Sequence, residues 1–179
     1  MEEKPARVAG QRGNRFQQSP PAPEAVDGDR AAHVGGDPPT KVTFLHLGMY
    51  RRRPAARAVV HLHSTWSVAV SVLADVEPED VLPPLTAYYV MRIGRLPLVP
   101  YYRPGDPALG AAVEALADRH HAVLLANHGP VVAGSDLDAA ANAIEELEET
   151  AKLHLLLHGR PVRPLTAAQV EDVRRHFPT

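Results

Sequence analysis

Apolar residues recur along the chain with two periods, one typical of helices and one typical of strands. The β-branched run Ala58–Leu62 predicts a buried strand. Asp136 is placed to cap the longest predicted helix, which runs from Leu137 to about His158 and ends before Gly159. The same criteria predict further helices over residues 41–52, 64–73, 85–93, 107–119 and 166–177, and extended segments over 96–101, 122–126 and 131–133. In the second of these helices, Ser64 is the predicted N-cap.

Because predicted strands alternate with predicted helices, the pattern favours an α/β fold with α/β/α layers. The first forty residues differ from this pattern. They are rich in proline and glycine, and no helical or strand period is visible between Glu2 and Asp29. Such a composition buries too little apolar surface to offset the entropy of ordering it. We therefore expect residues 1–28 to be disordered or irregular and residues 29–179 to form one domain.

Composition narrows the possible functions of the 179-residue chain, which has the usual size of a single domain. Its formal net charge of -2 gives no reason to expect nucleic acid or a membrane surface as a partner. No apolar run has the length of a membrane span, so a cytoplasmic location is predicted. The chain has 10 histidines and no cysteine, which excludes a thiolate metal site and leaves imidazole and carboxylate as ligands.

Two of the histidines, His61 and His63, flank Leu62 at the end of the predicted strand. Residues i and i+2 of a strand lie on the same face, so both imidazoles are expected to reach one metal ion. His128 is the best candidate for a third ligand because it follows the predicted strand 122–126 at a Gly129-Pro130 turn. Three neutral imidazoles with an open fourth position are typical of a catalytic zinc site.

The other histidines have plainer interpretations. We expect His120 and His121 to be surface or packing residues, and His154 and His158 to occupy ordinary helix positions. His46 is interpreted as a core residue or as a residue that supports the ligands, while His33 and His176 carry no signal. The chain has no Gly-x-Ser-x-Gly elbow, no phosphate-binding P-loop and no Gly-x-Gly-x-x-Gly fingerprint.

Three segments carry a family resemblance: VVHLHST at Val59–Thr65, LLANHGPVVAG at Leu124–Gly134, and the acidic run EELEETAKLHLLL. Together they resemble the class II aldolase/adducin family over roughly Val34 to Phe177. Within this family, Asp80–Leu109 is similar to 3-oxo-tetronate 4-phosphate decarboxylases. The resemblance implies a central, mostly antiparallel β-sheet.

The resemblance also implies that His61, His63 and His128 hold Zn²⁺ or another divalent metal, and that the protein is a homotetramer with sites between subunits. The implied activity is that of a metal-dependent carbon–carbon lyase acting on a phosphorylated sugar acid. The most similar members decarboxylate a 3-oxo-tetronate 4-phosphate through a metal-stabilised enediolate.

Two departures from the family pattern bear on activity. Family members carry a glutamate that acts as acid and base at the position of Val42. Valine carries no proton, and general acid–base catalysis contributes about a hundredfold to ten-thousandfold. The family's phosphate-binding loops also have no convincing match, since Gly13-Asn14 resembles them only weakly. The catalytic residue is therefore unknown from the sequence.

These departures leave alternatives open. The chain is expected to be N-terminally incomplete, or else to be a divergent enzyme that uses Tyr88, Tyr89 or a metal-bound water as proton donor. A catalytically impaired or non-catalytic family member is the main alternative function. A related sugar-phosphate aldolase or epimerase would use the same metal site and release no carbon dioxide.

Overall fold

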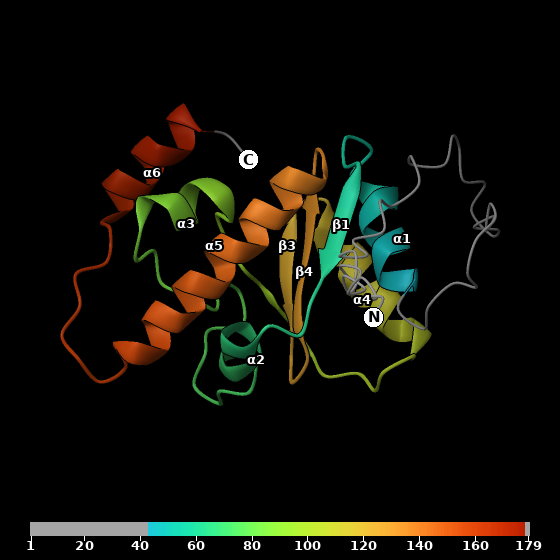
Figure 1. Ribbon diagram of the computed structural model, residues 1–179, viewed down its shortest axis with the longest axis horizontal. Coiled ribbons are helices and arrows are strands. Elements are labelled where there is room, and N and C mark those ends of the chain that lie inside the picture. Colours follow the sequence, from blue (N-terminus) through green and yellow to red (C-terminus); the bar gives the residue numbers. More distant parts are fainter. Residues whose placement is uncertain (1–42, 178–179) are drawn as a thin grey trace, which may run out of the picture.

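The computed structural model describes residues 43–177, and Figure 1 shows how their elements are arranged. The predictions for residues 1–28, for Val42 and for the start of the domain at residue 29 lie outside the described residues. The helices are α1 (Thr43–Arg52), α2 (Thr65–Ser71), α3 (Ala87–Arg92), α4 (Pro107–Ala117), α5 (Leu137–Leu156) and α6 (Ala167–His176). The strands are β1 (Ala58–His61), β2 (Leu98–Val99), β3 (Ala122–Leu125) and β4 (Gly129–Gly134).

The four strands form one sheet in the order β1-β4-β3-β2. β4 pairs antiparallel with β1 and with β3, whereas the two-residue β2 pairs parallel with β3. The prediction of a mostly antiparallel sheet is therefore confirmed. The register places His61 opposite Val131, so the end of β1 lies beside the turn that joins β3 to β4.

Each face of the sheet packs against its own apolar cluster. Val123 and Leu125 of β3 contribute to a cluster with α1 and α4, and the intervening Leu124 contributes to a cluster with α2, α3 and α5. This division follows from the strand period, since successive side chains point to opposite faces. Figure 1 shows α1 and α4 on one side of the sheet and the other helices on the opposite side. The prediction of α/β/α layers is confirmed.

Two strands differ most from the predictions: β2 covers only Leu98–Val99 of the predicted segment 96–101, and β4 extends beyond the predicted residues 131–133. β4 is longer because it lies between two partners: Gly129 pairs with Leu125, and Gly134 pairs with Ala58. Helix ends differ from the predictions by a few residues; for example, α4 ends at Ala117 and α5 at Leu156. None of the helices in the described part of the chain is long and apolar enough to cross a membrane.

Candidate metal centre

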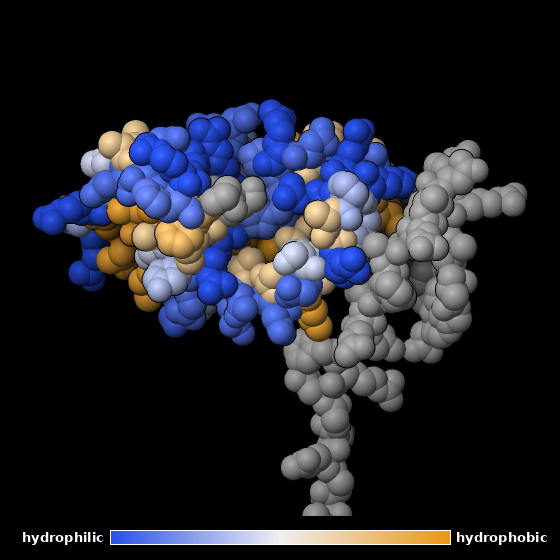
Figure 2. All heavy atoms as spheres, turned by 90° about the horizontal axis from the view of Figure 1, so that it is seen from above, coloured by the Kyte–Doolittle hydropathy of each residue, from blue (hydrophilic) through white to orange (hydrophobic). Residues whose placement is uncertain are grey.

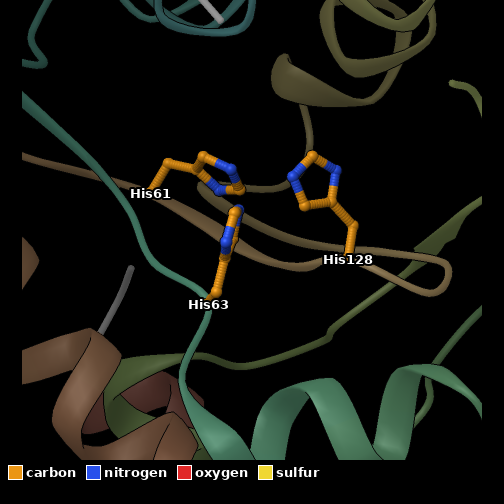
Figure 3. Close-up of side chains that lie close together, drawn as sticks. All are labelled: His61, His63 and His128. Carbon is orange, nitrogen blue, oxygen red and sulfur yellow. The ribbon is translucent and has the colours of Figure 1, made fainter. Parts of the chain in front are cut away.

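Three histidines converge at one end of the sheet. Figure 3 shows the rings of His61, His63 and His128 pointing toward one another, the first two from the end of β1 and the residues after it and the third from the turn between β3 and β4. Their centroids lie 4.7–5.1 Å apart, and one nitrogen from each ring lies within 4.8 Å of the other two. The sequence predicted this set. One detail differs: β1 ends at His61, so His63 lies in the segment that leads to α2.

His61 is already oriented for a ligand. Its Nδ1 lies 2.9 Å from the carbonyl oxygen of Pro130, to which it donates a hydrogen bond. This bond fixes the proton on Nδ1 and leaves the lone pair on Nε2. Nε2 is buried and has no hydrogen-bond partner among residues 43–177. A buried nitrogen acceptor without a partner is costly unless something binds it, so the site fits a metal ion.

Burial lowers the pKa of two histidines of the cluster, His61 and His128. Burial is the main cause that lowers the pKa of His61 to about 4, and the hydrogen bond to Pro130 opposes this effect. His128, His63 and His46 lower it further through charge repulsion. Burial, followed by repulsion from His63, also lowers the pKa of His128. A metal ion therefore has no proton to displace from Nε2 of His61 when it binds near pH 7.

The turn that carries His128 is held by its neighbours. Asn127 has the only positive φ among the described non-glycine residues, 57°, and its backbone N–H donates to Ser71 at the end of α2. The backbone of Gly129 packs directly against the carbonyl group of Leu62, so that a Cβ at this position would overlap the Leu62 oxygen. Only glycine allows the His128 turn to approach the His61–His63 segment this closely.

Glu148 is a supporting residue that the sequence analysis missed. Its carboxylate, on α5, accepts bonds from the backbone N–H groups of Trp66 and Ser67, each at 2.8 Å, and from the Ser67 hydroxyl at 2.7 Å. These bonds outweigh the effect of burial and lower the pKa of Glu148. Glu148 therefore fixes the start of α2, two residues after His63.

The predicted cap of α2 needs a correction. Ser64 does occupy the N-cap position, but its side chain makes no capping bond to the helix. Glu148 supplies that bond from a distant helix instead. No pattern in the sequence singles out Glu148 among the four glutamates of α5, because its role depends on how α5 packs against α2.

A hollow of about 500 Å³ opens beside the cluster, and His63 and His128 contribute to its wall. Tyr101 and Tyr102 also line it, together with Asn127. This tyrosine pair was not among the residues predicted from the sequence. The available signal was their position at the end of the predicted extended segment 96–101, before a proline-rich turn, since functional side chains often lie at strand ends.

The two tyrosines that the sequence analysis named as proton donors lie elsewhere. Tyr88 is exposed on α3 and is not among the residues that line the hollow. Tyr89 is 1% exposed inside the apolar cluster next to α5. Burial is the main cause that raises the pKa of Tyr89, and Asp80 adds to it.

The remaining histidines of the described residues stay outside the cluster. His46 is partly buried on α1, burial lowers its pKa, and it influences His61 electrostatically, which fits a supporting role. His121 donates a hydrogen bond from Nε2 to the Arg92 carbonyl at 2.8 Å, as expected of a packing residue. His154 lies on α5.

Comparison with known proteins identifies the fold family. The profile of the class II aldolase and adducin N-terminal domain matches residues 22–155, most of the chain. The chain belongs to the class II aldolase and adducin family. Among curated relatives, 3-oxo-tetronate 4-phosphate decarboxylase of Escherichia coli is 51% identical over 84% of this chain and 69% of its own length. L-fuculose phosphate aldolase of Haemophilus influenzae is 32% identical over 86% of this chain and 70% of its own.

Solved structures agree with this placement. The crystal structure of YgbL from Escherichia coli superposes with a TM-score of 0.77 at 52% identity, covering 79% of this chain and 68% of that one. An L-fuculose 1-phosphate aldolase superposes with a TM-score of 0.68 at 27% identity, covering 81% and 66%. The chain spans between 62% and 69% of the length of the five decarboxylase relatives.

Proposed function

We propose that this protein is a divalent-metal-dependent carbon–carbon lyase, with zinc as the metal, that decarboxylates a 3-oxo-tetronate 4-phosphate. The observation that carries the proposal is the convergence of three histidine nitrogens beside an open hollow. Relatives of about 51% identity that bear the name of this decarboxylase support the choice of reaction. We also propose that the protein acts in the cytoplasm.

In this proposal His61, His63 and His128 hold the cation, and Pro130 and Glu148 keep the first two oriented. A divalent cation supplies a Lewis acid for the negative charge that develops on the ketone oxygen of the substrate. The bond between the carboxylate carbon and its neighbour breaks, carbon dioxide leaves, and a proton is added to the remaining carbon.

We propose Tyr101 as the source of that proton, in place of the glutamate that Val42 replaces. Its side chain is 62% exposed and lines the same hollow as His63 and His128. A phenol carries its proton while uncharged, so it does not need to be protonated before it can act as the donor. Tyr101→Phe is expected to lower kcat by about a hundredfold or more and to leave metal content unchanged. Tyr88→Phe serves as the control, and equal activity of both variants with the native protein would contradict this role.

Metal analysis of purified protein tests the centre itself. We expect about one divalent ion per chain, and its loss in His61→Ala and His128→Ala. His158→Ala is the matched control because His158 is exposed beyond the end of α5. Equal metal content in all four proteins would contradict the centre.

Carbon dioxide release from a 3-oxo-tetronate 4-phosphate tests the reaction. Release by the native protein supports a divergent enzyme, and release only by Val42→Glu supports the alternative of a catalytically impaired family member. Cleavage of L-fuculose 1-phosphate without carbon dioxide release would instead support a sugar-phosphate aldolase. Metal content should be the same in the native protein and in Val42→Glu.

We also propose that the protein is an oligomer, with a homotetramer as the expected state. Leu153 and Leu156 on the last turns of α5 are 38% and 57% exposed, which is unusual for two leucines on one helix face of a monomer. Light scattering measures the assembly. A monomeric mass at working concentrations would contradict this part of the proposal.

A further inference from the structure

A second hollow, of about 640 Å³, lies at the end of the sheet opposite the histidine cluster. It is bordered by the ends of α1 and α3 and by the start of α5, which follows Gly134. Gly134 pairs with Ala58 at the beginning of β1, whereas His61 is at the end of that strand. In Figure 1 this end of the sheet is uppermost, and Figure 2 views the molecule from that side, where hydrophilic residues cover much of the surface.

The charge lining this hollow is positive. Arg52, Arg53 and Arg92 contribute to its wall, and no described residue in the wall is acidic. Arg52 is paired outside the hollow with Glu114 at 3.3 Å. Arg53 and Arg92 form no ion pair with any carboxylate of residues 43–177. We call this hollow the arginine pocket.

Two hydrogen bonds hold the arginine pocket in shape. Nη1 of Arg53 donates to the carbonyl oxygen of Ala117 at 3.1 Å, which anchors its half-buried guanidinium. The Arg92 carbonyl accepts the bond from His121, which fixes the end of α3 against the start of β3. Burial lowers the pKa of the Arg53 guanidinium, which remains charged at neutral pH. A partly buried cation without a counter-charge favours binding of an anion.

We propose that the arginine pocket binds a small oxyanion, a phosphate or carboxylate group of a small metabolite. Guanidinium groups match both kinds of oxyanion with paired hydrogen bonds. Ala56, Ala133 and Ala143 form the apolar part of the wall, so a short carbon chain attached to the anion also fits. The volume is in the range of small-molecule sites.

This inference is independent of the proposed reaction. The residues of the arginine pocket and those of the histidine cluster have no member in common. A ligand here would therefore act as a regulator or stabiliser, and its binding is measurable in a protein that shows no turnover.

The test is an NMR titration of the full-length, metal-loaded protein with inorganic phosphate and, separately, with malonate at constant ionic strength. We expect saturable shifts of the backbone amides of Gly134, Ser135 and Ala139. Arg92→Gln and Arg53→Gln should each weaken binding about tenfold. The Arg92 side chain makes no hydrogen bond in the described part of the chain, so Arg92→Gln tests the site even if Arg53→Gln fails to fold. Arg160→Gln, in the exposed loop after α5, is the control and should bind as the native protein does.

Tighter binding of phosphate would assign a phosphorylated ligand, and tighter binding of malonate a carboxylate; either supports the site. Absence of saturable shifts at these amides, or equal binding in Arg92→Gln and Arg160→Gln, would overturn it. Shifts that depend on protein concentration and accompany a change in mass would also overturn it, because an acidic group of a second copy would then be the occupant. Metal content and carbon dioxide release by Arg92→Gln report separately on the proposed function.

Discussion

The two ends of the sheet carry different kinds of polar side chain, histidines at one end and arginines at the other. At one end, the nitrogens of three histidine rings converge, and a hydrogen bond to the Pro130 carbonyl holds the His61 ring. At the other end, Arg53 and Arg92 retain their charges with no carboxylate of the described residues to balance them. Burial lowers the pKa of histidine below neutral pH, but it cannot neutralise arginine. The histidine end is therefore suited to a cation and the arginine end to an anion.

The largest expected effect is from a change that disturbs only the histidine end. Gly129→Ala pushes a methyl group into the Leu62 carbonyl and should cost about 1–3 kcal/mol of stability. It should also abolish stoichiometric metal binding, because His63 and His128 would move apart. Chemical denaturation and metal analysis measure both effects.

Gly159→Ala is the matched control for this change. Gly159 also has a positive φ, 72°, but a Cβ there meets no atom within 4 Å. We expect this variant to lose about 1 kcal/mol from backbone strain and to keep its metal. Full metal content in Gly129→Ala would show that the close approach to Leu62 does not position the ligands.

A smaller effect should follow from Glu148→Ala, which removes the cap of α2. Loss of a capping side chain costs about 0.5–2 kcal/mol, and second-sphere changes lower metal affinity about 10- to 100-fold. Glu149→Ala is the control, since Glu149 is exposed on the same helix and pairs only with Lys152 among the described residues. Competition with a zinc chelator measures the affinity. Identical affinities in the two variants would limit Glu148 to a role in stability.

His121 provides a pH test at the arginine end. Burial, followed by the charge of Arg53, lowers its pKa below the ordinary value of 6.5. A neutral His121 therefore contributes stability that is complete above pH 6.5 and is lost as the pH falls below it. Thermal unfolding of the metal-free protein should show a smaller acid loss of Tm in His121→Asn than in native protein or in His158→Asn. Equal slopes in the three proteins would contradict this assignment.

The smallest effect is expected from Glu114→Gln. Its ion pairs with Arg51 and Arg52 are 3.4 and 3.3 Å long and lie at the surface, so their loss should cost less than about 1 kcal/mol. The variant also leaves Arg52 with only its longer pair to Asp118, at 3.9 Å, and should tighten phosphate binding in the arginine pocket modestly. Weaker phosphate binding in this variant would count against electrostatic attraction as the basis of that site.

Much of the fold and the candidate site follows from sequence patterns. The buried strand at Ala58, the long helix α5 and the set His61, His63 and His128 were all predicted from period, capping residues and a family resemblance. Strand ends were predicted less well, because the length of β4 depends on pairing with β1 and β3. The proposed donor Tyr101 was missed in favour of Tyr88 and Tyr89, since nothing local reports which tyrosine faces the hollow.

The sequence by itself determined the family, the alternation of helices and strands and the identity of the converging histidines. Each of these depends on residues that are close together in the chain or on a short motif. The cysteine-free composition also restricted the ligands to imidazole and carboxylate. Only the tertiary structure decided that Glu148 caps α2 across 81 residues of chain and that Arg53 and Arg92 meet in one pocket. Such groupings depend on sheet register and helix packing. Both result from many weak contacts over the whole fold, so they leave no local pattern in the sequence.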